Sequence, residues 1–329
     1  MVIMGDKMNN FNNILCVVTT GEVSKPTLER AISLAENNQA QLTVVGVMQP
    51  VAEGITMLDG ARISTDLQTM MRTECLQALQ TLTEPYQQRL RIQHEVLVGT
   101  GFLEIIRTVL RNGHDLLIKP AENPSFVDRL FGSDDMHLLR KCPCPVWLTQ
   151  SEEKSNYRCI LAAIDFNPGM PDTAERGLNQ QILDLSSSLA LSDFAALHLV
   201  HVWDAPGEAT VRSWSNNPDE AATCYVEGER SRHERGFDRL CEELKSHLGT
   251  EVYEYLSPQL HLRRGAASTV IPETAKQLQA DMVVMGTVAR TGIAGLLIGN
   301  TAETILEQLR CAVLAIKPPG FISPVRSTE

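Results

Sequence analysis

The chain has 329 residues and a formal net charge of −11, with 43% hydrophobic and 21% charged residues. This length is more than one small domain needs, and the composition is ordinary for a globular protein, which argues against disorder. The negative charge repels nucleic-acid phosphates and anionic lipid surfaces, and no basic block offsets it. We therefore expect no nucleic-acid partner.

The segment Met1–Asn13 is polar and lacks the apolar core of a signal peptide. No apolar run approaches the ~18 residues that a membrane span needs. We therefore expect a cytoplasmic protein with no membrane span. The eight cysteines are scattered, mostly within apolar stretches, and are interpreted as reduced thiols that pack as small hydrophobic groups.

Four short apolar runs of the first half recur in the same order in the second half. The matched pairs are Ile14–Thr19 with Ile160–Asp165, Leu42–Met48 with Ala196–Val202, Val96–Gly99 with Leu262–Gly265, and Asp115–Ile118 with Asp281–Val284. Each half then closes with a Gly-containing loop, a helix and a last strand, over Gly132–Leu148 and Gly299–Ile316. This order predicts an internal duplication.

Between these runs, apolar residues recur at intervals of three and four, which predicts amphipathic helices. Examples are Leu76, Leu79 and Leu82, then Leu178, Ile182, Leu185 and Leu189, and then Phe237, Leu240, Leu244 and Leu248. A helix over Phe102–Asn112 is expected to end at a left-handed Gly113. Pro272 is expected near the start of the corresponding helix, where a missing N–H is tolerated.

Short β-branched runs without alternation are typical of strands that are covered on both faces. The predicted fold is therefore α/β, with two tandem Rossmann-like domains over residues 1–150 and 157–329. Each domain is expected to be an open five-stranded, mostly parallel sheet with helices on both faces. The polar stretch Gln150–Asn156 is the predicted linker.

In an open parallel sheet, ligands bind beyond the carboxyl ends of the strands, where the strand order reverses. In the second half this rule points to Asp165 and to the loop that follows Met285. The loop runs from Gly286 to Thr301, with glycines at its ends, and a helix follows it. Glycine lets backbone N–H groups approach a phosphate, and the start of a helix favours negative charge, so the layout suits an anion.

This loop resembles that of the universal stress protein family, in which Gly, two residues, Gly, nine residues, Gly and then Ser or Thr wrap ATP phosphates. Here Gly286 and Gly299 match the first and third glycines, while Ala289 and Asn300 replace the second glycine and the hydroxyl residue. The resemblance further implies that Asp165 lies near the ribose. It places Val202 beside the adenine of ATP or a related nucleotide.

The first half departs further from the family pattern. Thr19 replaces the aspartate, and Lys119-Pro-Ala-Glu122 occupies the place of the early glycines. Gly132-Ser133 survives, but the adjacent Asp134-Asp135 would repel a phosphate. We expect no ATP in this half. The phrases His137–Pro143 and Gly299–Glu303 resemble the two-domain E type of the family, which is associated with stress resistance and survival of damage.

Structural roles compete with several of these functional ones. Asn300 with Glu303 forms an ordinary capping box, and Asp165 suits a cap through Asn167-Pro168. Cys142-Pro-Cys144 lacks the Cys-x-x-Cys spacing of redox and metal sites. Two further sets are interpreted as structural or solvated, namely His198 with His201, which point to opposite faces of a strand, and the cations Arg263, Arg264 and Arg290.

The sequence thus predicts a non-enzymatic stress-response protein that binds a small nucleotide-like or other anionic ligand in its second half. One alternative is slow ATP hydrolysis, with Asp165 positioning a metal. Another is a larger amphipathic ligand, held by apolar loop residues that include Ile293, Leu296, Leu297 and Ile298. The family also implies pairing through last strands. A tandem chain can satisfy that pairing internally, although self-association remains open.

Overall fold

The computed structural model describes residues 11–18, 25–51, 64–122, 133–150, 154, 156–169, 173–287 and 299–326. Within these ranges the strands form one 10-stranded sheet in the order β3-β2-β1-β4-β5-β10-β9-β6-β7-β8. Neighbouring strands are parallel except β5 and β10, which are antiparallel. The sheet is therefore two five-stranded parallel halves joined through their last strands, and the predicted fold class and internal pairing are confirmed.

The strands are short and mostly buried. They are β1 (Asn13–Val18), β2 (Gln41–Met48), β3 (Ile92–Val98), β4 (Leu116–Pro120), β5 (Val146–Thr149), β6 (Cys159–Ile164), β7 (Ala196–Trp203), β8 (Gln259–Arg264), β9 (Met282–Gly286) and β10 (Ala312–Ile316). The two edge strands are the exceptions, because β3 has only Val96 and Leu97 buried and the residues of β8 are exposed or only partly buried.

Helices cover both faces of the sheet, with one hydrophobic core on each face. The first core takes residues from α1 (Lys25–Asn38), α2 (Ser64–Thr83), α5 (Thr173–Asp193), α7 (Pro218–Leu248) and α8 (Thr250–Leu256). The second takes residues from α3 (Gly101–Asn112), α4 (Ser133–Lys141), α9 (Ala267–Gln277) and α10 (Asn300–Gln308). A short 3-10 turn, η2 (Glu84–Tyr86), follows α2.

One of the two sequence-based predictions about the helices is confirmed, and the other is wrong. Gly113 is left-handed, at φ 66° and ψ 38°, and ends α3 as predicted. Pro272, however, lies inside α9, so the expectation of a place near the helix start was wrong. The carbonyl of Ser268, which loses its helical partner to the proline, instead accepts a hydrogen bond from Gln308 Nε2 at 3.0 Å. A neighbouring helix thus satisfies the group that the proline leaves unpaired.

A buried ion pair links the two halves beside the linker. Arg30 of α1 lies 2.7 Å from the carboxylate of Asp193 at the end of α5, and both side chains are about 95% buried. The guanidinium group stacks over Tyr157, 4.2 Å from the ring centroid, and Tyr157 accepts a hydrogen bond from Trp147 Nε1 at 3.2 Å. Polar groups from both halves therefore fix the junction that the β5–β10 pairing creates.

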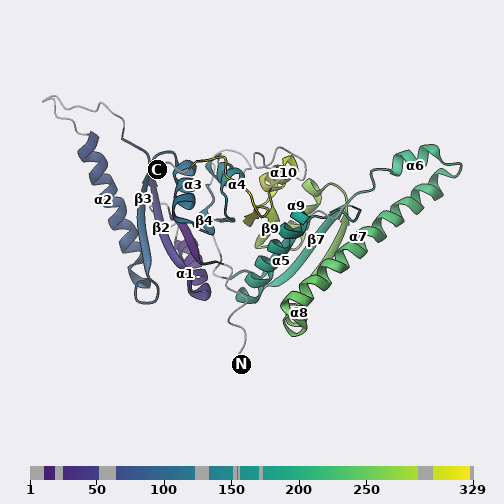
Figure 1. Cartoon of the computed structure of the whole chain (residues 1–329), viewed down its shortest axis with the longest axis horizontal. Coiled ribbons are helices and arrows are strands. Elements are labelled where there is room, and N and C mark those ends of the chain that lie inside the picture. The colour runs from purple at the N-terminus through teal and green to yellow at the C-terminus, as the bar shows by residue number, and fades with distance from the viewer. Residues whose placement is uncertain are drawn as a thin grey trace.

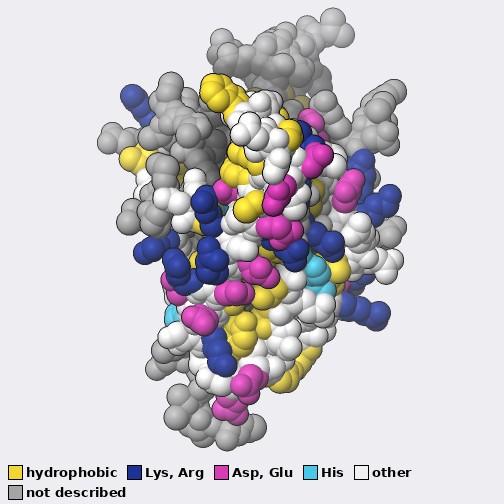
Figure 2. Space-filling view, turned by 90° about the vertical axis from the view of Figure 1, so that its right-hand side faces the viewer, with side chains coloured by type: hydrophobic (Ala, Val, Ile, Leu, Met, Phe, Trp, Pro, Cys, Tyr) yellow, Lys and Arg dark blue, Asp and Glu magenta, His cyan; other side chains and the backbone are white. Residues whose placement is uncertain are grey.

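The second half carries a helical extension at the β8 end of the sheet. The short helix α6 (Glu208–Trp214) and the start of α7 project from the body of the molecule (Figure 1). In the C-terminal half of α7, Phe237, Cys241 and Leu244 are buried against the sheet. Seen from the side of this extension, the right-hand side of Figure 1, acidic and basic side chains are interspersed over the surface (Figure 2).

Candidate functional site

The predicted site residues of the second half gather at one edge of the sheet. β6 ends just before Asp165, β9 ends at Gly286, and Val202 lies next to the last residue of β7. β6 lies between β9 and β7, so the chain leaves β6 in one direction and returns on its other side. This is the point of strand-order reversal, where open α/β sheets bind ligands.

The loop after β9 is closed at its base. The N–H of Gly299 donates to the carbonyl of Thr287 at 3.2 Å, and the N–H of Thr287 donates to the carbonyl of Ile316 at 3.2 Å. The two ends of the loop are therefore fixed to each other and to β10. Ala289, Arg290 and the apolar positions proposed for a larger ligand lie outside the described residues.

The start of α10 differs from the predicted capping box. Gly299 is the cap residue, with the extended φ of −63° and ψ of 138°, and its carbonyl accepts the N–H of Glu303 at 3.0 Å. Asn300 and Thr301 are the first residues of the helix and are exposed. The carboxylate of Glu303 pairs instead with Arg140 of α4. Because Gly299 has no side chain to accept the N–H groups of the first turn, this end of α10 suits an anion.

Gly286 has a packing reason to be glycine. A Cβ atom at this position would lie 2.7 Å from Cδ2 of Leu178 in α5. The sequence assigned the glycine to the approach of a phosphate, and the structure supplies a second requirement, since α5 packs directly against the end of β9. Its presence is therefore weaker evidence for a ligand than the motif suggested.

Asp165 is exposed at the start of a compact turn. Its backbone N–H donates to Asn179 Oδ1 at 3.3 Å, and its carbonyl accepts Asn179 Nδ2 at 2.9 Å. The turn is closed by Asn167, whose Oδ1 accepts the N–H of Gly169 at 2.9 Å. We name residues 165–169 the Asp165 turn. α5 thus holds the backbone of the turn at the carboxyl edge of the sheet.

The sequence reasoning missed Lys317, which follows β10 at the same edge. Its side chain is buried and donates to the hydroxyl of Thr287 and to the carbonyl of Leu139 in α4. Burial lowers the pKa of Lys317 to about 8. A lysine directly after the last strand was the available signal, but its burial depends on α4 of the other half.

The corresponding place in the first half is filled by the chain itself. Lys119, near the end of β4, lies 2.7 Å from Asp135 in the first turn of α4, and both side chains are buried. The second carboxylate oxygen of Asp135 accepts the N–H of Glu122 at 2.7 Å. The sequence predicted repulsion of a phosphate by Asp134-Asp135, and the structure shows that Asp135 is neutralised by Lys119. Thr19 and Gly132 lie outside the described residues.

The other polar candidates occupy packed or surface positions. Cys142 and Cys144 are buried with their sulfurs 3.5 Å apart, and all eight cysteines are free thiols. Arg264 pairs with Glu208 and lies over Trp203, 5.8 Å from the ring centroid. In the part of the chain that the structure describes, no group of three or more His, Cys, Asp or Glu side chains could hold a metal ion.

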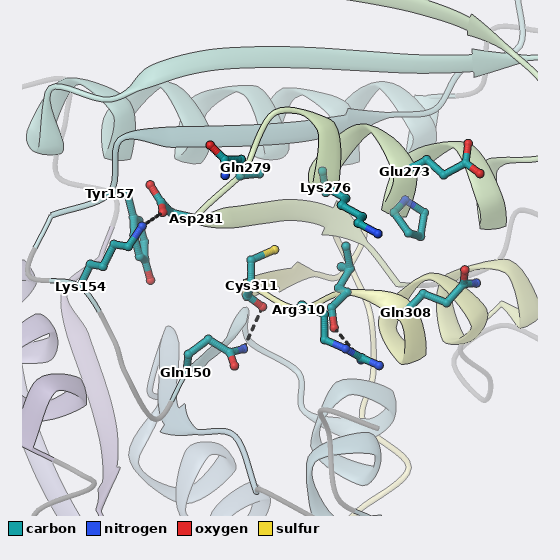
Figure 3. A pocket seen from close by; sticks show the side chains of 14 residues that line it. Gln150, Lys154, Tyr157, Glu273, Lys276, Gln279, Asp281, Gln308, Arg310 and Cys311 are labelled. Atoms are coloured by element: carbon teal, nitrogen blue, oxygen red, sulfur yellow. Dashed lines mark hydrogen bonds and ion pairs between the residues drawn. The ribbon is translucent and has the colours of Figure 1, made fainter. Parts of the chain in front are cut away.

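A pocket of about 840 Å³ lies at the opposite edge of the sheet, before β9 and β10 (Figure 3). Lys154 of the linker pairs there with Asp281, and Gln150 donates to the carbonyl of Cys311 at 2.9 Å. Arg310 donates to the carbonyls of Glu307 and Leu309 at the end of α10. These polar groups thus stabilise the junction of the two halves and the end of a helix.

The fold and the position of the site place the chain among tandem α/β proteins of the Rossmann-like type. The family model described as "Universal stress protein family" matches residues 10–150 and 156–317. The chain therefore belongs to the universal stress protein family, and this membership connects it to the stress response. None of the described helices is both long enough and apolar enough to cross a membrane.

Named relatives share the tandem arrangement along their length. The chain is 28% identical over 326 residues to universal stress protein E of Escherichia coli, covering 97% of this chain and 98% of that protein. It is 27% identical over 318 residues to a universal stress protein E homolog of Haemophilus influenzae, covering 94% and 98%. A crystal structure titled as a putative universal stress protein from Pseudomonas aeruginosa matches with a TM-score of 0.65 and 26% identity, over 95% of each chain.

Proposed function

We propose that the second half holds a small nucleotide-like or other anionic ligand between the Asp165 turn and the start of α10. The ligand would lie beside Val202, with its negative group at Gly299, Asn300 and Thr301. The protein would act in stress resistance by binding this ligand, with the first half serving a structural or regulatory role.

The observation that carries this proposal is the difference between the two halves at equivalent positions. At the fourth residue of the strand, β4 of the first half has Lys119 and β9 of the second half has Met285. At the third residue of the helix, α4 of the first half has Asp135 and α10 of the second half has Ala302. The first half thus places its own carboxylate at the start of its last helix. The second half leaves the same place to a small apolar side chain, which supports an anion from outside.

Lys317 adds a positive charge to this region. It is 5% exposed, it hydrogen-bonds the loop residue Thr287, and within the described residues no ion pair joins it to a carboxylate. A buried ammonium group is costly unless an anion or several acceptors compensate for it. An anionic ligand at the adjacent helix start would supply part of this compensation.

Binding without turnover fits the described residues best. Hydrolysis of ATP would require an acid that positions a metal ion. Asp204, which follows β7, is exposed at this edge, and so is Asp165, the candidate that the sequence offered. The exposed position of Asp165 at the mouth of the site suits contact with a ribose hydroxyl or with solvent.

The test combines native mass spectrometry of the purified full-length protein with calorimetric titration by ATP and AMP. We expect one bound anionic molecule per chain, and loss of that molecule in Gly299→Val. Release of inorganic phosphate from ATP would instead support the slow ATPase. A protein that carries no anion and binds neither nucleotide would refute the proposed function.

A further inference from the structure

Two histidines lie behind the Asp165 turn. His201 of β7 is 1% exposed, and its Nε2 lies 2.8 Å from Nδ1 of His233 in α7. The other ring nitrogen of His201, Nδ1, lies 3.1 Å from the carbonyl oxygen of Ile164, the last residue of β6. The pair therefore connects α7 to the strand that carries the Asp165 turn.

The partner atoms fix the direction of both hydrogen bonds. A carbonyl oxygen only accepts, so Nδ1 of His201 carries a hydrogen and donates to Ile164. In neutral His201 the remaining Nε2 is then an acceptor, and Nδ1 of His233 must donate to it. The result is a directed chain from His233 to His201 to the backbone of β6.

Phe166, the second residue of the Asp165 turn, is held between these two elements. Its ring stacks on His201, with centroids 3.8 Å apart and planes inclined by 17°. The edge of the same ring lies against α7, since a Cβ atom at Gly236 would be 2.4 Å from Phe166 Cε2. The position of the turn thus depends on how α7 sits on β7.

We propose that the His201–His233 hydrogen bond is a pH-responsive clasp that holds α7 and the Asp165 turn against β7 and releases both on acidification. This inference rests on the proposed function only in placing the ligand at the Asp165 turn. A first proton enters at Nε2 of His233, where the imidazolium still donates to His201. A second proton on Nε2 of His201 would set two N–H groups against each other and leave two adjacent cations.

The charged groups around the clasp are few in the described chain. On α7, Glu229 favours protonation of His233 and is itself paired with Arg232 at 2.7 Å. From β8, Arg264 lies over Trp203, which stacks on His233 with centroids 5.8 Å apart. Asp165 follows β6 directly. Within the described ranges no carboxylate forms a hydrogen bond or ion pair with His201, so a proton on its buried ring lacks a counter-charge among these residues.

The chain contains a matched control. His198, on the opposite face of β7, forms a second histidine pair with His261 of β8, with Nδ1 and Nε2 2.9 Å apart. This pair joins two adjacent strands, and among the described residues it makes no ring contact or hydrogen bond with α7 or Phe166. His233→Gln keeps an N–H donor for neutral His201, but its amide can turn to offer an oxygen to a protonated Nε2 of His201, so this ring can take up a proton without breaking the clasp. His261→Gln makes the same change in the control pair.

The test is hydrogen exchange with mass spectrometry on the full-length protein without ligand, between about pH 7 and about pH 5. After correction for the intrinsic exchange rate, we expect protection in residues 161–169 and 225–240 to fall by up to about tenfold per pH unit. This fall should persist in His261→Gln and disappear in His233→Gln. An unchanged wild-type protein, or an equal fall in both variants, would overturn the clasp.

A second measurement needs no substitution. Nitrogen chemical shifts of the histidine rings at neutral pH should show a hydrogen on Nδ1 of both His201 and His233, and none on Nε2 of His201. The opposite tautomer of His201 would overturn the directed chain. Neither measurement requires a ligand, so failure of the clasp and failure of the proposed ligand site are distinguishable. With ATP as the probe, affinity at low pH should fall in the wild-type protein and be retained in His233→Gln.

Discussion

Lys119 and Asp135 form an ion pair with 2.7 Å between ammonium and carboxylate, and the two side chains are only 7% and 0% exposed. This pair occupies the place in the first half where a helix start would otherwise attract an external anion. In the first half, the carboxylate of Asp135 therefore takes the position that an anionic ligand would take at the start of the helix.

The first prediction concerns the stability of this pair. Asp135→Ala should destabilise the protein by ~3–5 kcal/mol, because the buried ammonium group of Lys119 then keeps only the more distant and more exposed carboxylate of Glu122, at 3.5 Å, as its ion-pair partner. The double variant Lys119→Met with Asp135→Ala copies Met285 and Ala302 of the second half. It should recover most of this loss, and urea denaturation measures both. Equal destabilisation of the single and double variants would show that the charge is not the cause.

A second prediction separates the two roles of the loop end. Gly299→Val should abolish ligand binding while the protein stays folded, because φ −63° and ψ 138° suit a β-branched residue and the side chain would enter the approach path. Asn300→Ala should weaken binding and change the free energy of unfolding by less than ~0.5 kcal/mol, since Gly299 is the cap. Calorimetry and denaturation give the two quantities. A clear loss of stability in Asn300→Ala would restore the capping box that the sequence suggested.

A third prediction concerns two glycines of α7. A Cβ atom at Gly228 would meet nothing within 4 Å, so Gly228→Ala should stabilise the protein by up to ~1 kcal/mol through helix propensity. Gly236→Ala should destabilise it, because the new methyl group would collide with Phe166. Thermal unfolding compares the two variants. Equal stabilisation of both would mean that the Phe166 ring moves freely.

Acidification should destabilise the folded protein in a defined window. Burial is the main cause that lowers the pKa of seven histidines, to about 4 for His201. The others are His94, His114, His137, His198, His233 and His261. Below ~6.5 the unfolded chain therefore binds more protons than the folded one. The contribution of these neutral histidines to the free energy of unfolding should be fully present above about pH 6.5. It should decrease as the pH falls toward about 4, by up to ~1.4 kcal/mol per pH unit for each buried neutral ring.

Urea denaturation at a series of pH values measures this loss. His233→Gln and His261→Gln should each reduce the slope, and their effects should add, because the two pairs lie on opposite faces of β7. A slope that neither variant changes would assign the acid sensitivity to the first-half histidines, His94, His114 and His137, or to carboxylates.

The fold was readable from the sequence because its signals are local and repeated. Apolar runs in the same order predicted the strands, and Gly113 marked a helix end that the structure confirms. The position of Pro272 inside a helix could not be predicted in the same way. Its tolerance inside α9 depends on Gln308 of another helix, which is distant along the chain.

Some residues of the candidate site could likewise be predicted from the sequence, and others could not. The spacing of Gly286 and Gly299 was visible as a motif, and the structure brings both to the edge that also carries Asp165 and Val202. Lys317 was not visible as a site residue, because its partners are Thr287 and a carbonyl of the other half. The neutralisation of Asp135 by Lys119 likewise depends on the packing of α4 against β4.

The antiparallel pairing of β5 with β10 has a consequence for how the two halves evolve. Identical subunits that met through this strand would meet by diffusion, and any change in one site would appear in both. Here the partner is covalently attached, so its effective concentration is fixed by the linker and does not depend on the amount of protein in the cell. Each half is then free to change separately, so one copy can lose its ligand while it still supplies half of the other copy's scaffold.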